Sequence, residues 1–181
     1  MKLKTLFASA FCLLLAGYGG ATTFAADVEQ SNGIDVSVET ADNGVITLMD
    51  GDKEIGVFFP EEVLDEMPQV YSSNIEGRGG LIIGLKINDI IQPLSTKTYQ
   101  TEYMNANDSI SFSLSWTYNS TTAFGVNLPA PYNPVTIATS SQGKYIGSYF
   151  TKVTGSISPF IKNNATARAT TYSGSIQYNF Y

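Results

Sequence analysis

The chain has 181 residues, of which 10 are Lys or Arg, 16 are Asp or Glu, one is Cys and none is His. Without His, the sequence excludes Ser-His-Asp and Cys-His activation of a nucleophile and any His-ligated zinc site. Only 14% of the residues are charged, against about 25% in an average globular domain. We therefore expect a protein that is not an enzyme, with no catalytic residues and a surface rich in Ser, Thr, Asn, Gln and Tyr.

The N-terminus has the three-part pattern of a secretory signal peptide. Lys2 and Lys4 precede an apolar run at 6–16, and mostly small residues follow as far as Ala25. This run is shorter than the roughly 20 apolar residues that span a bilayer, so we expect no membrane insertion of the mature chain. Residues 1–25 are therefore predicted to direct export to an extracellular or cell-envelope location. Because Cys12 lies inside this segment, the mature chain would have neither disulfides nor thiolate metal sites.

Charge is divided along the chain. All 16 acidic residues lie between Asp27 and Asp108, where 4 basic residues leave a net charge of −12. Residues 109–181 contain 4 basic residues and no acidic ones. The acidic half could dock on the second half or repel anionic polymers, or the second half could simply be strands with a Ser and Thr surface. The net negative charge argues against nucleic acid and anionic membrane surfaces as partners.

The first half predicts short strands. Residues 34–40 alternate apolar and polar side chains, and residues 45–49 resume a β-rich run after Asn43-Gly44. Asn-Gly is a dipeptide typical of hairpin turns, so these residues predict a β-hairpin. Residues 54–59 predict a third strand.

A short helix is predicted near residues 60–67. Pro60 suits a first helical position, and acidic residues in the first turn suit the positive end of a helix. Residues 68–80 are rich in Gly and Ser and predict a linker or long loop. Residues 81–91 are too apolar for an exposed strand, so we expect them in a core.

The second half has longer strands. Residues 109–118 alternate over their whole length, and residues 172–180 behave similarly, which indicates strands with one buried face. Further strands are predicted at 144–153 and at 155–161, where Pro159 indicates an edge or a bulge. The fold class is therefore all-β, an antiparallel β-sandwich of jelly-roll or Ig-like type. We divide the mature chain into an acidic β-rich N-terminal region, residues 26–92, and a β-sandwich module, residues 93–181.

One family resemblance rests on strand motifs. Residues 105–116 contain Ile-x-Phe-x-Leu-x-Trp, and residues 172–178 contain Tyr-Ser-Gly-Ser-Ile-Gln-Tyr after Phe-Ile-Lys-Asn-Asn at 160–164. This layout resembles small secreted jelly-roll modules of Gram-positive bacteria, similar to bacterial pre-peptidase C-terminal domains, over roughly residues 97–181. Residues 142–145 depart from the family's usual Leu-Pro-x-Gly-x-Tyr. The resemblance implies an accessory or binding role outside the cell, with no catalytic residues.

One loop has the composition of a weak calcium site. Asp50, Asp52 and Glu54 place three carboxylates around a Gly turn, and calcium prefers oxygen ligands of this kind. The spacing lacks the further ligands of an EF-hand, which makes a solvated hairpin turn the better interpretation. We expect no cofactor other than this possible calcium ion.

Tyrosines are the candidate ligand-binding residues. Tyr118, Tyr132, Tyr145 and Tyr149 fall near predicted strand ends or turns. A ring with a polar tip contributes a large contact area to the recognition of a polysaccharide, a cell wall or a protein surface. Tyr132 follows two prolines in the loop 129–134, where strand pairing is not expected. Packing in the core is the alternative for all four.

The sequence therefore favours a secreted or cell-envelope-associated, non-catalytic binding or accessory protein. A structural, self-assembling surface or matrix protein is the first alternative, since long strands with Ser and Thr faces suit edge pairing. A small outer-membrane β-barrel is the second. The sequence leaves the ligand and the oligomeric state open.

We predict that the exported chain begins near Ala26, because the predicted signal peptide ends at Ala25. Mass spectrometry of protein from the culture supernatant measures the N-terminus directly. A membrane-bound chain that retains Met1 would contradict the prediction.

Overall fold

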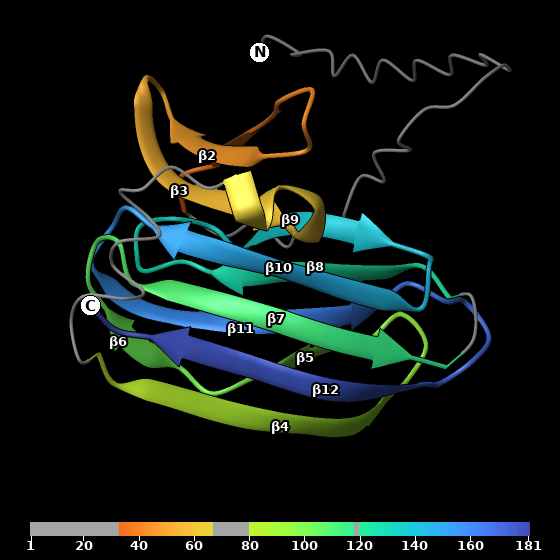
Figure 1. Cartoon of the computed structure of the whole chain (residues 1–181). Helices are drawn as coiled ribbons and strands as arrows, with labels where there is room; N and C mark the ends of the chain where they lie inside the picture. The colour runs from red at the N-terminus through yellow and green to blue at the C-terminus, as the bar shows by residue number, and fades with distance from the viewer. Residues whose placement is uncertain (1–32, 67–79, 118–119) are drawn as a thin grey trace, which may run out of the picture. The chain divides into compact units, whose positions relative to one another are not determined.

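The computed structural model describes residues 33–66, 80–117 and 120–181 (Figure 1). All of these residues belong to one compact unit. The predicted signal peptide and all but residue 80 of the predicted linker lie outside the described residues. Within the described residues, no helix has both the length and the apolar character needed to cross a membrane.

The described residues form twelve strands in two sheets and one short 3-10 helix, η1 (Glu61–Glu66). Across the larger sheet, the strands are β1 (Ser37–Thr40), β2 (Ile46–Asp50), β3 (Lys53–Pro60), β10 (Lys144–Thr151), β7 (Ser109–Trp116), β12 (Thr170–Asn179) and β4 (Ile82–Ile91). Across the smaller sheet, they are β5 (Thr96–Thr98), β11 (Gly155–Asn163), β8 (Thr122–Asn127) and β9 (Val135–Ser140), with β6 (Glu102–Met104) also paired to β11.

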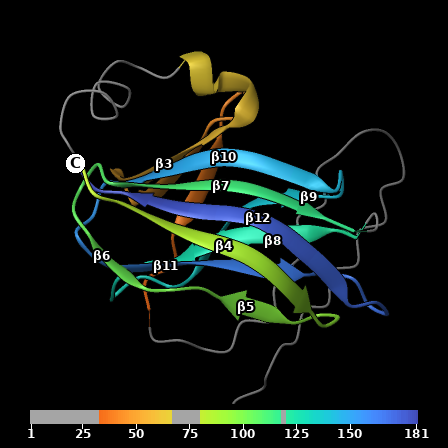
Figure 2. The same cartoon turned by 60° about the horizontal axis from the view of Figure 1, so that its bottom comes forward.

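The strands from β4 onward form a jelly roll. With β5 and β6 counted as one interrupted strand, this part of the chain has eight strands. The first strand pairs with the eighth, the second with the seventh, the third with the sixth and the fourth with the fifth. All of these pairings are antiparallel, and two sheets face each other across one core (Figures 1 and 2). The predicted all-β sandwich is confirmed, and its type is the jelly roll. Because β4 is the first strand of this roll, the sandwich begins before the predicted boundary at residue 92.

The predicted N-terminal hairpin extends the larger sheet. β1 pairs with β2, and the turn between them has Gly44 at φ 83° while the Asn43 side chain accepts a hydrogen bond from the Val45 N–H. β3 then pairs with β10, which joins the hairpin to the jelly roll. The predicted short helix is present as η1, in which Val63 packs over Phe59 and other apolar residues of β3 and β10. A second, small core therefore lies on the outer face of this sheet.

The predicted core position of residues 81–91 is corrected by the sheet order. β4 is an end strand, so only one of its two edges pairs with a neighbouring strand, β12, and only one of its two faces lies against the core. Ile87 and Ile91 are buried, but Leu81, Ile82 and Ile90 are 65%, 63% and 67% exposed. The local apolar composition is that of an interior strand, whereas the topology places it at an edge.

Pro159 lies inside a sheet rather than at the predicted edge or bulge. β11 has β8 on one side and the interrupted pair β5 and β6 on the other. β6 pairs with residues 155–157 and β5 with residues 160–162, so Pro159 falls at the interruption. A residue without an N–H is tolerated there because no ladder bond is required of it.

A row of aromatic rings fills the main core. The rings follow one another in the order Phe58, Tyr145, Phe124, Trp116 and Tyr172. The centroid distances between neighbouring rings, in this order, are 5.7, 4.5, 5.5 and 6.1 Å. Only Phe124 comes from the smaller sheet, and its ring lies between two rings of the larger sheet. Such contacts contribute about 0.5–1.5 kcal/mol per pair beyond their buried area.

We predict that Trp116→Ala lowers the free energy of unfolding by about 3–5 kcal/mol, as other large-to-small core changes do. Trp116 is buried, and its indole N–H donates to the Ser120 carbonyl at 3.1 Å. Ser113→Ala, on the exposed face of the same strand, should change the free energy of unfolding by less than about 0.5 kcal/mol. Denaturant titrations measure both, and equal midpoints for the two variants would contradict the assignment of faces.

Candidate functional site

Two of the predicted ligand-binding tyrosines are part of the core. Tyr145 stacks between Phe58 and Phe124, and Tyr149 is fully buried. Burial raises the pKa of both hydroxyls well above the ordinary tyrosine value, and nearby Glu62 adds to the effect at Tyr145. Neither hydroxyl has a hydrogen-bond partner among the described residues. The prediction that these rings contact a ligand is therefore wrong for Tyr149 and unsupported for Tyr145, because the packed sheets surround them.

Tyr132 is engaged with the N-terminal segment. It forms a parallel β-bridge with Ile34, although strand pairing was not expected in this loop. Its hydroxyl donates to the Asp50 carboxylate at 3.1 Å. Burial, followed by this hydrogen bond, raises the pKa of Tyr132. The neighbouring Asn133 side chain donates to the Asp35 carboxylate at 2.7 Å. The loop 129–134 therefore holds the N-terminal hairpin region in place, and we call these contacts the N-terminal clamp. Tyr132 is not free at the tip of the loop to recognise a ligand.

The remaining sequence candidates do not assemble into a site. Tyr118 lies outside the described residues. Asp50 is occupied by Tyr132, while Asp52 and Glu54 are exposed. Among the described residues, no three His, Cys, Asp or Glu side chains lie close enough together to hold a metal ion. The predicted calcium site is therefore not formed by the arrangement of these three carboxylates.

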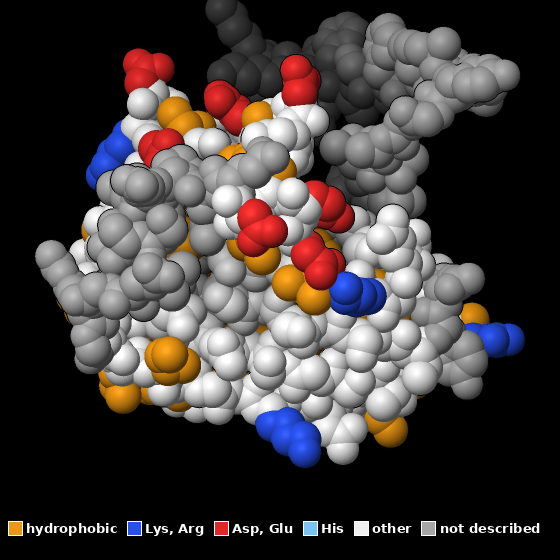
Figure 3. Space-filling view, in the orientation of Figure 1, with side chains coloured by type: hydrophobic (Ala, Val, Ile, Leu, Met, Phe, Trp, Pro, Cys, Tyr) orange, Lys and Arg blue, Asp and Glu red, His pale blue; other side chains and the backbone are white. Residues whose placement is uncertain are grey.

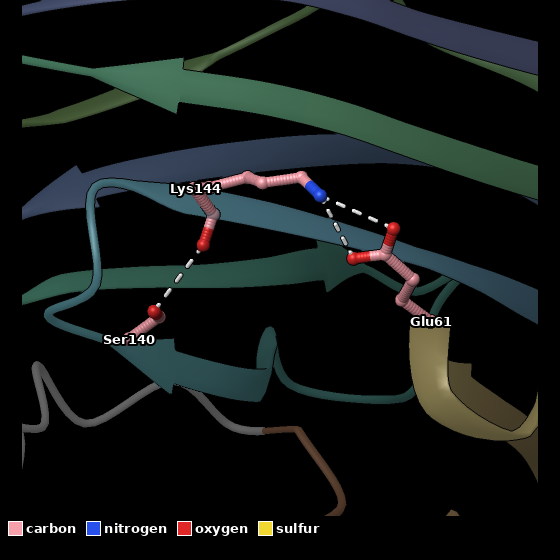
Figure 4. A network of polar contacts seen from close by, with 3 residues as sticks. All are labelled: Glu61, Ser140 and Lys144. Atoms are coloured by element: carbon pink, nitrogen blue, oxygen red, sulfur yellow. Dashed lines mark hydrogen bonds and ion pairs between the residues drawn. The ribbon is translucent and has the colours of Figure 1, made fainter.

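The acidic residues gather on the N-terminal extension. Residues 33–66 contain 10 acidic residues and one lysine, a net charge of −9, whereas residues 80–181 contain 3 acidic and 6 basic residues, a net charge of +3. In Figure 3, most of the acidic side chains lie over β2, β3 and η1. An ion pair links the two parts, since the Lys144 ammonium lies 3.1 Å from both carboxylate oxygens of Glu61 (Figure 4). Both side chains are about half exposed, so the pair contributes little to stability.

A polar depression opens between the β7–β8 and β11–β12 loops. It is lined by Ser120, Thr121 and residues 164–168. Part of its wall is fixed by backbone hydrogen bonding, since the Asn164 N–H donates to the Thr121 carbonyl at 3.0 Å. Among the residues that the structure describes, no aromatic ring lines it.

The free edge of β4 is the most unusual surface feature among the described residues. The Phe180 N–H donates to the Leu81 carbonyl across the β12–β4 register, which makes this a hydrogen-bonded pair. Such pairs alternate along an antiparallel ladder. The odd residues of β4 are therefore bonded to β12, and the even residues direct their N–H and C=O groups to the free edge. These even residues are Ile82, Gly84, Lys86, Asn88 and Ile90.

Exposed apolar side chains accompany these backbone groups. Besides Leu81, Ile82 and Ile90 on or beside β4, Leu94 is 62% exposed and Tyr103 is 66% exposed. Leu94 follows β4 directly, and Tyr103 lies on β6, at the edge of the smaller sheet. Figure 2 shows β4 and β5 along the same side of the sandwich. This side therefore offers unpaired backbone groups together with a set of apolar side chains.

The sequence interpretation missed this edge. Residues 81–91 were expected in the core on apolar content alone. A signal was nevertheless present, because Lys86, Asn88 and Gly84 all fall on the even positions, which makes one face of the strand more polar than the other.

No family model matches the sequence. No curated protein matches it either. Among solved structures, the chain is similar to the VP2 subviral particle of infectious bursal disease virus, with 14% identity and a TM-score of 0.35, over 77% of this chain and 43% of that one. It is also similar to the Gt strain structure of the same virus, with 14% identity and a TM-score of 0.33, over 76% of this chain and 41% of that one. The chain spans less than half of each of these proteins. The resemblance to pre-peptidase C-terminal domains stays a prediction.

The buried tyrosines predict a loss of stability in alkali. Burial raises the pKa of Tyr99, Tyr145, Tyr149 and Tyr178 above the value of about 10 expected in the unfolded chain. Below that pH both states keep these protons. As the pH rises further, the unfolded chain loses them first, so the free energy of unfolding falls. Denaturant titrations at about pH 8 and about pH 11 should show the decrease.

Tyr149→Phe is the variant that tests this cause. The variant lacks one of the buried hydroxyl protons. Its free energy of unfolding should therefore decrease less between the two pH values than that of the wild type. The matched control is Tyr103→Phe, which changes an exposed ring and should leave the decrease as in the wild type. Identical decreases in all three proteins would contradict the prediction.

Proposed function

We propose that this protein is an exported, non-catalytic structural protein that assembles with further copies of itself through the free edge of β4. One observation carries the proposal. Among the described strands, β4 is an end strand that is long, continuous in register and carries two isoleucines, Ile82 and Ile90, that are about two-thirds exposed. Unpaired strand edges of this kind are templates for the addition of another strand.

The other outer strands have the features that limit edge pairing. β1 is four residues long and carries Glu39. β5 and β6 are three residues each and are separated by a break. β9 has a register shift in its pairing with β8. Short edges, charges and irregularities are the usual means of keeping edges apart. β4 has ten residues, no register shift and a single exposed charged side chain, Lys86, so it is the least protected of them.

The positions of the tyrosines favour assembly over tyrosine-mediated binding of a polysaccharide or cell wall. Of the four candidate tyrosines, Tyr145 and Tyr149 pack in the core and Tyr132 binds Asp50. Ligand recognition by these rings would require the sandwich or the N-terminal clamp to open. Association through β4 requires no rearrangement of the described residues, because the groups that would pair lie at the surface among them.

Export is part of the proposal and rests on residues 1–25. Outside the cell, an assembly cannot rely on disulfides in this chain, since the predicted mature sequence has no Cys. Backbone hydrogen bonds along a strand edge and apolar contacts beside them supply association without covalent links.

We predict that the purified chain associates in a concentration-dependent manner and that Ile90→Lys weakens this association about tenfold. The loss of burial of one isoleucine side chain costs about 1.5 kcal/mol or more. Val38→Lys, on the edge strand at the other end of the same sheet, is the matched control and should associate as the wild type does. Sedimentation velocity over a concentration series measures association, and thermal unfolding verifies that both variants are folded. A wild-type chain that stays monomeric throughout would overturn the proposed function.

A further inference from the structure

We infer that two copies of the chain pair through β4 in an antiparallel manner, around a two-fold axis at Lys86, and that the two facing lysines make this pairing stronger as salt increases. The inference rests on the proposed function, because it specifies the joint through which the copies assemble. It adds a register, a symmetry and a dependence on ionic strength, each of which has its own measurement.

Backbone geometry limits the possible registers. The N–H and C=O groups of the even residues face the free edge, as the Phe180–Leu81 hydrogen bond establishes. Residues directly opposite each other in an antiparallel pair have their side chains on the same face. Even residues of one copy must therefore lie opposite even residues of the other. Any register that pairs even with odd residues would place the core face of one copy against the solvent face of the other.

The exposed isoleucines select one of the remaining registers. Ile82 and Ile90 lie four residues before and four residues after Lys86. A two-fold axis at residue 86 therefore places each Ile82 opposite Ile90 of the second copy. A two-fold interface requires a surface that complements itself, and this spacing supplies it. Both side chains, which are about two-thirds exposed in the single chain, then gain an apolar partner.

A shift of the register removes this match. With the axis at residue 87, Ile90 lies opposite Gly84 and Ile82 lies opposite Gln92, so neither isoleucine gains an apolar side chain. With the axis at residue 86, Gly84 instead lies opposite Asn88 of the second copy. There is room for this, because no atom lies within 4 Å of the position a Cβ would take at Gly84. The half-buried Leu85 then lies opposite Ile87, and the next pair on that face is Ile83 with Asp89, whose carboxylate is already paired with Lys97.

The cost of the selected register is that Lys86 faces its own copy. Like charges directly opposite each other destabilise a strand pair. The four-carbon stems allow the ammonium groups to separate into water at the exposed face, which limits the cost. Salt screens the remaining repulsion, so association should strengthen with ionic strength. A partner that presented a carboxylate to Lys86 would show the opposite dependence.

The first test is disulfide cross-linking of the full chain with Cys12→Ser, so that each introduced Cys is the sole thiol. In the inferred register, Lys86→Cys lies opposite itself, at the Cα separation of about 5.5 Å that a disulfide can bridge. We expect it to form a covalent dimer on mild oxidation. Asn88→Cys alone should not, but a mixture of Asn88→Cys and Gly84→Cys should. Ser113→Cys, exposed on β7 and away from the edge, is the control and should stay monomeric.

The second test is the salt dependence of association, measured by sedimentation velocity. Wild-type association should tighten as NaCl is raised. Lys86→Gln should associate about two- to fivefold more tightly at low salt and should lose most of the salt dependence. Weaker association of Lys86→Gln, or weaker wild-type association in high salt, would overturn the role of the paired lysines.

The outcomes separate this inference from the proposed function. If the wild type associates but Asn88→Cys alone cross-links while Lys86→Cys does not, the register is wrong and assembly through β4 stands. If the wild type associates and none of the β4 cysteines cross-links, the joint lies elsewhere, which overturns both the register and the use of β4. If the wild type does not associate, the proposed function itself fails.

Discussion

The packing of Phe124 between Tyr145, on which its ring is stacked, and Trp116, against which it is tilted, is the contact on which the rest of the structure depends. Phe124 is the ring that the smaller sheet contributes to the aromatic row, so it joins the two layers of the jelly roll at their centre. A chain without Cys in its predicted mature part has no covalent cross-link to hold the layers together. The close packing of these rings takes that role, and it determines where the tyrosines of the chain can lie.

That packing has consequences for function. Tyr145 and Tyr149 are enclosed with hydroxyls that lack partners among the described residues, and Tyr172 finds one in Thr122 at 2.9 Å. Rings used in this way are not available for recognition at the surface. The N-terminal extension similarly engages Tyr132 through Asp50, so the loop that a free tyrosine would require is occupied by the protein's own hairpin region.

The exposed apolar surface is concentrated where the jelly roll leaves a strand without a neighbour. β4 is the first strand of the roll and pairs with the last, which leaves its other side without a paired strand among the described residues. The acidic extension lies at the other end of the same sheet, beyond β10. The larger sheet therefore ends in a negatively charged, short-stranded edge at one end and, at the other, in a long edge that carries two exposed isoleucines. This difference between the two ends is the basis for proposing that one of them forms a joint.

The sequence by itself determined the local features of this protein. Period-two alternation identified the buried faces of β7 and β12, and Asn43-Gly44 identified the hairpin, because both depend on residues close together in the chain. Only the tertiary structure decided that β4 is an edge, that Pro159 falls at a break in a neighbouring strand and that Tyr132 reaches Asp50. Each of these results depends on pairing between residues about 60 to 100 positions apart. Composition cannot reveal such pairing, since an apolar strand has the same sequence pattern whether one neighbour or two will cover it.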